Sequence, residues 1–223
     1  MRSARQWHAT TAVVASAALL LQVFLIVIDH QAVEGEPYVD RLTRFGRLVS
    51  YFTIQCNLLV AITSVQLTRD PARDGRNWRA LRIAAVVGIT VTGVVHFFLL
   101  RDQFDLEGVD WVGDKLLHMV VPALALAGWA MFGPRPRVDG RAMGLAICWP
   151  LAWLAWTLVM GAATGWYPYP FLDHREPDGV TGVVTTSIGI TMFFLVLFAI
   201  AHWIDRRAKP VPEAGLPREH VTG

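Results

Sequence analysis

The sequence predicts an all-α protein that crosses a membrane with a bundle of six helices. Of its 223 residues, 54% are hydrophobic, and the mean hydropathy is +0.41. Soluble domains are typically about 45–50% apolar. The excess here is concentrated in six runs of about 20 residues, the length that spans a bilayer. No apolar run is left over and no linker exceeds a short loop, so we expect one transmembrane domain over 1–204.

The first expected helix, 9–28, follows two arginines, as the apolar core of a signal peptide would. It is longer than such a core, however, and no A-x-A cleavage site closes it, so we interpret it as a span. The remaining helices are expected at 46–67, 80–100, 114–132, 142–163 and 183–204. After 204 the chain becomes polar and rich in proline, which predicts a disordered tail over 205–223.

The net charge of +2 is small, but its distribution predicts the topology. Arginines gather after the second, fourth and sixth helices, whereas acidic residues gather in the other three loops. The positive-inside rule therefore predicts a multi-pass protein of the cell membrane with both termini and the tail in the cytoplasm. Topology explains the basic clusters, so we do not expect nucleic acid as a partner. The basic positions are Arg69, Arg73, Arg76, Arg79, Arg135, Arg137, Arg141, Arg206, Arg207 and Lys209. The acidic positions are Glu34, Glu36, Asp40, Asp102, Asp105, Glu107, Asp110, Asp173, Glu176 and Asp178.

The second helix has a stripe of small and polar residues. Ser50, Thr53, Asn57, Ala61 and Ser64 recur at spacings of three and four, which places them on one face of a helix. Such residues in a membrane helix typically face the bundle, where polar groups find partners. We therefore expect this face to be buried.

Three polar side chains are expected at one depth near the outer surface. Thr53 lies about 10 Å below the outer end of 46–67, at a rise of 1.5 Å per residue. His96 on the third helix and His118 on the fourth each lie about 6 Å from the outer end. Ionisable residues inside a membrane are expensive, and repeated polarity at one level therefore indicates a functional site.

The fourth helix carries two features around its histidine. Asp114 precedes His118 by one turn, so it reaches the imidazole and can fix its tautomer and support its positive charge, as the third group of a triad does. Pro122 follows His118 by four residues and removes the hydrogen bond that would reach the His118 carbonyl. We expect the helix to bend there and to leave that carbonyl free.

Each of these residues also has a structural explanation. A threonine in a membrane helix commonly bonds its own backbone four residues back, and Thr53 is open to that interpretation. His118 and His96 could each simply form a hydrogen bond to a neighbouring helix. Asp114 could simply mark a helix end that faces water. Neither a metal nor another cofactor is expected, because the two cysteines, Cys56 and Cys148, lie within apolar runs and form no zinc-binding pattern.

Three blocks of sequence carry a resemblance to a known family. Tyr51-Phe52-Thr53-Ile54 opens the second helix, and His118 precedes Pro122 on the fourth. The third block, 165–174, reads Gly-Trp-Tyr-Pro-Tyr-Pro-Phe-Leu-Asp-His and follows the fifth helix. In this order the blocks resemble the androgen-induced membrane protein family, and the match is closest to its bacterial branch of integral membrane proteins. The resemblance covers most of the membrane core, roughly 46–203.

The animal members of that family are six-helix hydrolases that cleave fatty-acid esters of hydroxy fatty acids. The resemblance implies that Thr53 is the nucleophile and His118 its base. It also implies that the partner is a membrane lipid or fatty-acyl ester that reaches the site from the bilayer. For the oxyanion donor we expect Asn57, one turn below Thr53, while Tyr167 or Tyr169 closes the entrance or donates to the substrate.

Two other classes of function are compatible with the sequence. His96 and His118, at one depth on neighbouring helices, suit bis-imidazole ligation of a b-type haem in an electron carrier. Polar residues inside a membrane are also typical of transporters, although here the cluster is confined to the outer side and no inverted repeat is apparent. A non-catalytic scaffold or sensor with the same fold is a further alternative.

Overall fold

The computed structural model describes residues 2–30, 38–101, 103 and 105–208. Within these ranges the chain is helical and has no strand. Five helices are long and apolar enough to cross a membrane, and a bent pair, α2 (Arg41–Ser50) with α3 (Phe52–Arg69), makes a sixth if it is one span. The expected all-α, multi-pass architecture is confirmed at this level.

The other elements lie where the sequence predicts them, although the first and fourth expected helices begin earlier, at Arg2 rather than 9 and at Gly108 rather than 114. They are α1 (Arg2–Val27), α4 (Arg76–Val95), the π-helical turn η1 (His96–Leu100), α5 (Gly108–Lys115), the π-helical turn η2 (Leu116–Val120), α6 (Val121–Phe132), α7 (Gly140–Thr164), the 3₁₀ turn η3 (Pro170–Leu172) and α8 (Gly179–Arg207). The boundary expected at 204 falls inside α8, so 205–207 are helical rather than part of a tail. The rest of the expected tail, 209–223, lies outside the described residues.

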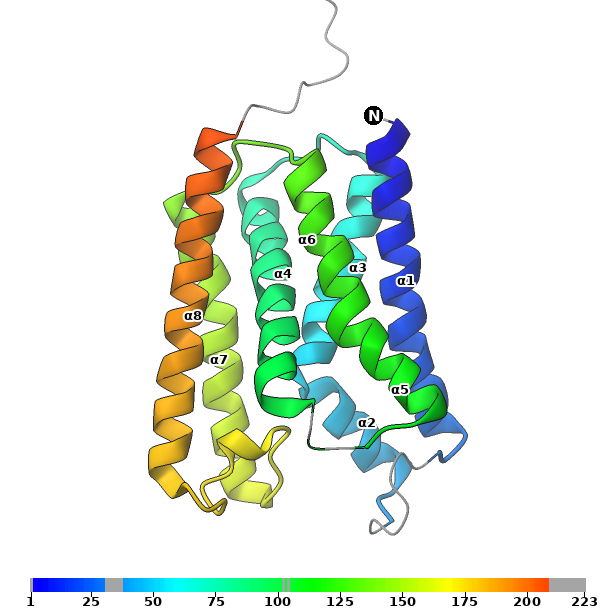
Figure 1. The fold of residues 1–223 in the computed structure, drawn as a ribbon, viewed down its shortest axis with the longest axis vertical. Coiled ribbons are helices and arrows are strands. Elements are labelled where there is room, and N and C mark those ends of the chain that lie inside the picture. Colours follow the sequence, from blue (N-terminus) through cyan, green and yellow to red (C-terminus); the bar gives the residue numbers. More distant parts are fainter. Residues whose placement is uncertain (1, 31–37, 102, 104, 209–223) are drawn as a thin grey trace, which may run out of the picture.

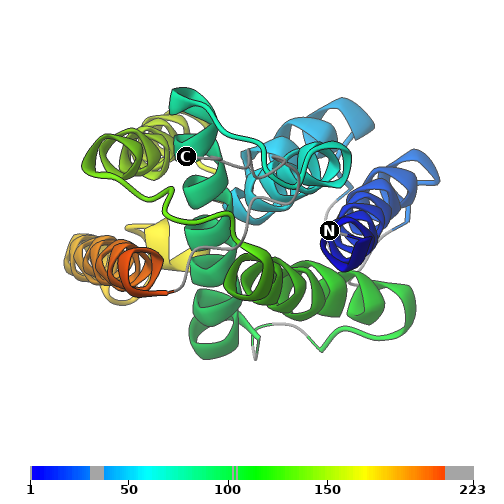
Figure 2. The same cartoon turned by 90° about the horizontal axis from the view of Figure 1, so that it is seen from above.

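Helix α4 is the centre of the bundle. It packs against α3 and α6 on one side and against α7 and α8 on the other, while α1 lies against α3 and α6 (Figure 2). Its residues Ile83, Ala85 and Ile89 are almost fully buried. Helices α7 and α8 have few contacts with each other. The start of α1 and the end of α8 lie at one end of the bundle, and α2 lies at the other (Figure 1).

The second helix is not the straight span that the sequence predicts. It breaks at Tyr51, which is extended (φ −67°, ψ 127°), and α2 and α3 are bent by 70°. Arg41, Arg44 and Arg47 give α2 a charged face, and Arg41 forms an ion pair with Asp29 at 2.7 Å. A charged amphipathic helix is stable along an interface rather than across hydrocarbon. The break removes Ser50 from the predicted stripe, and Ser50 bonds the Gly46 carbonyl within α2.

The backbone groups released by this break have partners from other elements. The Val49 carbonyl accepts a hydrogen bond from Gln55 Nε2 at 3.0 Å, and the Ser50 carbonyl accepts one from Trp153 Nε1 at 2.9 Å. On the other side of the break, the Thr53 N–H donates to the Tyr169 hydroxyl at 3.2 Å. Irregular backbone inside a membrane domain requires such pairing, so α7 and the 165–178 loop stabilise the bend.

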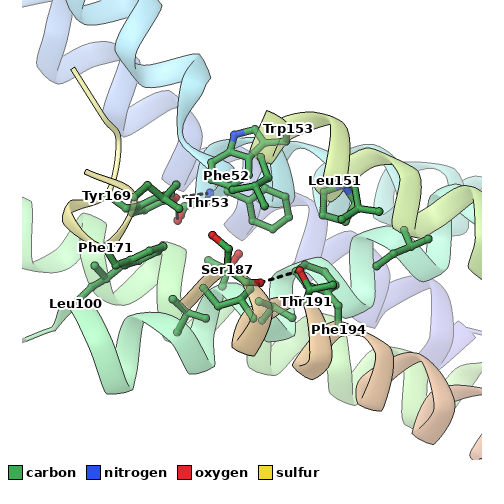
Figure 3. Close-up of a pocket in the computed structure, with 18 residues that line it drawn as sticks. Phe52, Thr53, Leu100, Leu151, Trp153, Tyr169, Phe171, Ser187, Thr191 and Phe194 are labelled. Carbon is green, nitrogen blue, oxygen red and sulfur yellow. Dashed lines mark hydrogen bonds between the residues drawn. The ribbon is translucent and has the colours of Figure 1, made fainter. Parts of the chain in front are cut away.

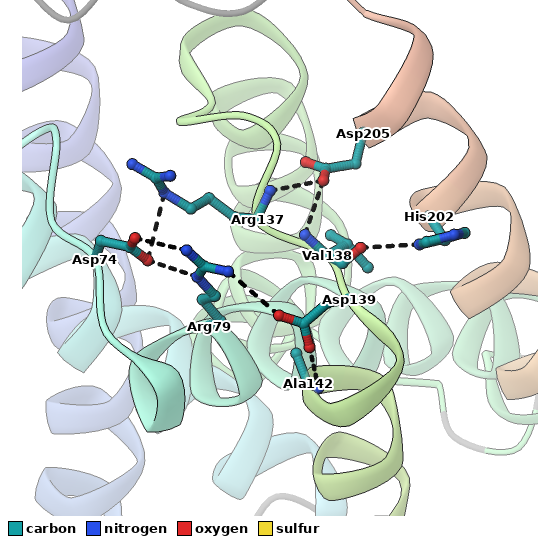
Figure 4. A network of polar contacts seen from close by, with 8 residues as sticks. All are labelled: Asp74, Arg79, Arg137, Val138, Asp139, Ala142, His202 and Asp205. Carbon is teal, nitrogen blue, oxygen red and sulfur yellow. Dashed lines mark hydrogen bonds and ion pairs between the residues drawn. The ribbon is translucent and has the colours of Figure 1, made fainter.

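A polar network closes the opposite end of the bundle (Figure 4). Arg79 donates twice to Asp74, at 2.7 Å each, and once to Asp139 at 3.2 Å. The hydrogen bond from Arg79 lowers the pKa of Asp74 to about 2. Asp205 of α8 accepts hydrogen bonds from the backbone N–H groups of Arg137 and Val138, at 2.6 and 2.7 Å. These contacts attach the loops before α4 and α7 to the end of α8.

Candidate active site

Thr53 lies at the start of α3, where its hydroxyl meets residues from two distant segments. Its Oγ1 is 3.2 Å from His118 Nε2 and 3.2 Å from the Tyr169 hydroxyl. The side chain is buried, with 6% of the residue exposed. Figure 3 shows Thr53 and Tyr169 side by side at the edge of a cavity. The structure thus brings Thr53 and His118 within hydrogen-bonding distance.

The His118 ring is oriented by Asp114. Its Nδ1 is 2.9 Å from Asp114 Oδ1 and 3.1 Å from the backbone carbonyl oxygen of the same residue. Because Nδ1 faces oxygen acceptors, it carries the proton of the neutral ring, and Nε2 is left as an acceptor for the Thr53 hydroxyl. This order of hydroxyl, imidazole and carboxylate is that of a hydrolytic triad.

Asp114 also connects the histidines to each other. Its Oδ2 accepts a hydrogen bond from Lys115 Nζ at 2.9 Å and lies 3.4 Å from His96 Nε2. The rings of His96 and His118 stack, with centroids 3.9 Å apart and planes 10° from parallel. His96 therefore packs on the face of the His118 ring, and the hydrogen bonds of the Thr53 hydroxyl go to His118 and Tyr169 instead.

Both histidines lie in π-helical turns, η1 and η2. Single π turns inside α-helices occur frequently at functional sites. In η2 the Val121 N–H bonds to the Leu116 carbonyl, five residues back. In a regular α-helix the Val121 N–H would bond to the Leu117 carbonyl, so the π turn leaves that carbonyl without its usual helical donor. The free carbonyl expected at His118, opposite Pro122, stays a prediction.

Asn57 supplies the missing bond. Its Nδ2 donates to the Leu117 carbonyl at 3.2 Å and to the Thr53 carbonyl at 2.8 Å. Both amide hydrogens are thus directed at backbone oxygens, and Asn57 is fully buried. In this arrangement it joins α3 to η2 and does not face the Thr53 hydroxyl, so it is not placed as the oxyanion donor that the sequence suggested.

The two tyrosines of the 165–178 loop have different positions. The Tyr169 hydroxyl contacts both N and Oγ1 of Thr53, and burial raises the pKa of Tyr169, so this hydroxyl keeps its proton. The Tyr167 hydroxyl instead contacts His174 Nδ1 at 3.2 Å, and its ring packs on Gly161. Tyr169 is therefore part of the site, whereas Tyr167 lines its approach.

Sequence reasoning missed the donor that the helix break creates. As the second residue of α3, Thr53 has a backbone N–H without a partner in its own helix, and this N–H points to Tyr169. Helix N-termini carry partial positive charge and bind anions. The three-residue spacing of Arg41, Arg44 and Arg47 indicates a charged helical face before the expected start at 46, but it does not mark the break at Tyr51.

Thr53 lies between two cavities of opposite character. An apolar chamber encloses about 670 Å³ of empty space, including its mouth, and its walls come from α3, α4, α7, α8 and the 165–178 loop (Figure 3). A larger vestibule of about 1800 Å³, lined by Asp114, His118, Lys115 and Trp166 among others, covers the other side of the site. Thr53 and Tyr169 line both cavities.

The same cluster has the composition of a metal site. His96, Asp114 and His118 have ligand atoms within 4.8 Å of one another. An ion there, however, would have to displace the 2.9 Å contact between His118 and Asp114, and rings stacked face to face do not converge on one ion. The stack also leaves no room for a porphyrin between the two imidazoles, so the geometry disfavours bis-imidazole ligation of haem.

Comparison of the chain with protein-family models, with curated proteins and with solved structures gives no match.

The close approach of α4 to η2 gives a test of how the base is held. A Cβ on Gly93 would lie 3.0 Å from the His118 carbonyl oxygen and 3.3 Å from Pro122 Cβ. Gly93→Ala is therefore expected to push η2 away and to destabilise the protein by about 1–3 kcal/mol, the usual range for overpacking. The measurement is thermal unfolding of the purified protein in detergent.

Gly189→Ala is the matched control, because a Cβ at Gly189 meets no atom within 4 Å. This variant should be neutral or more stable by up to about 1 kcal/mol, since alanine favours the helix. Equal unfolding temperatures for the two variants would contradict the proposed close contact.

Proposed function

We propose that this protein is a membrane-embedded hydrolase of fatty-acyl esters, with Thr53 as nucleophile and His118 as general base. The observation that supports this proposal is the continuous chain of contacts from Thr53 Oγ1 to His118 Nε2, at 3.2 Å, and from His118 Nδ1 to Asp114 Oδ1, at 2.9 Å. A threonine hydroxyl is a weak nucleophile until a base removes its proton. When His118 takes that proton it becomes an imidazolium ion, which the Asp114 carboxylate stabilises.

In the first half of the reaction, Thr53 Oγ1 attacks the ester carbonyl carbon as its proton passes to His118 Nε2. The tetrahedral intermediate collapses, the bond to the leaving oxygen breaks, and His118 returns the proton to the departing alcohol. In the second half, a water molecule from the vestibule gives a proton to His118 and attacks the acyl-threonine. Thr53 leaves and recovers that proton, and the free fatty acid is released.

Two donors stabilise the negative charge on the intermediate. The Thr53 backbone N–H is at the positive end of α3, and the Tyr169 hydroxyl is 3.2 Å from it. The substrate oxygen takes the place beside Thr53 N that the tyrosine oxygen now occupies, and the Tyr169 O–H donates to it. Preorganised donors of this kind are the largest contribution in many acyl-transfer enzymes.

The two cavities bind different parts of the substrate, one on each side of Thr53. The acyl chain occupies the apolar chamber, whose walls include Phe52, Leu151 and Phe194. The leaving alcohol and the attacking water occupy the polar vestibule. Since α7 and α8 both line the chamber but have few contacts with each other, a lipid enters from the bilayer between them.

The orientation in the membrane follows from charge. The end that carries the start of α1 and the end of α8 also carries the arginine-rich segments 69–79 and 135–141. The positive-inside rule assigns this end to the cytoplasm of a cell membrane. The Thr53 site then opens at the outer surface.

The spatial arrangement of the three sequence blocks supports membership of the androgen-induced membrane protein family. The blocks are far apart in the chain, yet Thr53 of the first contacts His118 of the second and Tyr169 of the third. Blocks that were only similar by chance would have no reason to meet around one hydroxyl. The family's ester hydrolysis is the activity that we carry over to this chain.

The nucleophile is tested with a fluorophosphonate probe, which forms a covalent adduct with activated hydroxyls. Wild-type protein in detergent should be labelled at Thr53, and Thr53→Val, which keeps the shape and removes the hydroxyl, should not be labelled. His118→Gln should label at least about 100-fold more slowly, because general-base catalysis contributes about 10²–10⁴-fold. Mass spectrometry of the labelled peptide locates the adduct.

Thr68→Val is the matched control on the same helix, since the Thr68 hydroxyl only bonds the Ser64 carbonyl four residues back. It should label as the wild type does. Equal labelling of wild type and Thr53→Val would rule out Thr53 as the nucleophile.

The oxyanion role of Tyr169 is tested by removing one oxygen. Tyr169→Phe keeps the ring that stacks on Phe171 at 5.3 Å and deletes the hydroxyl that contacts Thr53. We expect kcat for p-nitrophenyl decanoate to fall by about 10²–10³-fold, as is typical for the loss of one oxyanion donor, with little change in KM. Tyr167→Phe removes a hydroxyl that bonds His174 instead and should change kcat less than about 3-fold. Similar kcat values for the two variants would refute the assignment.

The chamber is tested by filling it. Ser187 projects into its centre from α8 (Figure 3), so Ser187→Phe should shorten the acyl chain that fits. We expect kcat/KM for p-nitrophenyl palmitate to fall at least about 10-fold while that for the acetate changes little. The control is Ile188→Phe, whose side chain is 58% exposed on the outer face of the same helix. An equal loss for acetate and palmitate would contradict the chamber as the acyl site.

A further inference from the structure

An unpaired arginine is buried at the end of the bundle that lies away from Thr53. Arg82 of α4 is 5% exposed, and its closest polar contact is from Nη1 to Thr63 Oγ1, at 3.5 Å. Its Nε and Nη2 have no hydrogen-bond partner among the described residues. No carboxylate pairs with it in that part of the chain, and the titratable neighbour that senses its charge, His8, cannot supply a negative one. A buried charge without a partner is strongly unfavourable.

The two unpaired atoms are adjacent on one edge of the guanidinium group. Nε–H and Nη2–H point in parallel, and this fork matches two oxygens of one carboxylate or phosphate. Arg82 is among the residues that line a cavity between α4, α6 and the loop that precedes α7, which has about 270 Å³ of empty space including its opening to solvent. Arg79 and Arg137 line the same cavity, together with the rings of Trp78 and Trp129.

The three arginines that line this cavity differ in their partners. Arg79 bridges Asp74 and Asp139, and Arg137 Nε lies 3.4 Å from Asp74. Both carboxylates are ionised at neutral pH, because Arg79 lowers the pKa of Asp74 and a hydrogen bond from the Ala142 N–H lowers that of Asp139. Arg79 and Arg137 thus have carboxylate partners, whereas the Arg82 guanidinium group has none among the described residues.

We propose that the cavity beside Arg82 binds a phosphate group that carries one negative charge. The fork on Arg82 selects a tetrahedral oxyanion over a halide, because two oxygens of one group accept the two parallel N–H bonds. One guanidinium group without a carboxylate partner favours a monoanion, which the phosphodiester of a phospholipid headgroup and monobasic phosphate both provide. Tryptophan walls at a helix end are typical of the membrane interface, where headgroups lie. This site is independent of the proposed hydrolase.

The test is thermal unfolding of the full chain, purified in a nonionic detergent at constant ionic strength and pH 6. One arm adds inorganic phosphate and the other adds dihexanoyl phosphatidylglycerol, with sodium chloride as the reference. We expect at least one of the two to raise the unfolding temperature by several degrees, since a ligand that binds only the folded state stabilises it. A shift with the lipid alone identifies a headgroup, and a shift with inorganic phosphate shows that a soluble anion suffices.

Arg82→Gln should lose that shift, whereas Arg76→Gln, an exposed arginine six residues earlier on α4, should keep it. If Arg82→Gln does not fold, Arg82→Lys retains the charge without the fork and should raise the half-saturating ligand concentration at least about 10-fold. The proposal is overturned if neither phosphate ligand shifts the wild type, if chloride shifts it equally, or if the Arg82 variants respond as the wild type does.

Discussion

The helix break at Tyr51 is the constraint on which the site depends. In hydrocarbon, a chain that interrupts a helix exposes N–H and C=O groups that water cannot satisfy, so other parts of the protein must supply partners. Here Gln55, Trp153 and Tyr169 do so. The tyrosine is the partner that matters for chemistry, because the N–H that it satisfies belongs to the residue whose hydroxyl faces His118. Folding and the proposed catalysis therefore use the same backbone group.

Asp114 organises the polar side of the site. Its two carboxylate oxygens lie against His118 Nδ1, Lys115 Nζ and His96 Nε2, at 2.9, 2.9 and 3.4 Å. The two π turns contribute by placing both imidazoles in contact face to face. Asn57 also stabilises this region, since it donates a hydrogen bond to the Leu117 carbonyl, which the π turn leaves without its helical donor.

Part of the fold and part of the candidate site could be predicted from the sequence. Periodicity and depth identified the buried face of Thr53 and Asn57 and the level shared with His118, because helical geometry alone relates those positions. The break at Tyr51 was not accessible, since neither glycine nor proline marks it and the apolar run continues through it. The role of Tyr169 depends on a loop fold that no periodicity encodes. The buried position of Arg82 was not predicted, because Arg82 follows four arginines that the membrane topology explains.

The sparse packing between α7 and α8 has a consequence for how the protein behaves in different surroundings. Both helices lean on α4 and leave their outer faces to the lipid, so protein alone does not complete the wall of the chamber between them. The acyl tails of the host bilayer then form part of that wall. The width of the chamber thus depends on the lateral pressure and the thickness of the membrane. A cell that changes its lipid composition would change that width without changing the protein sequence.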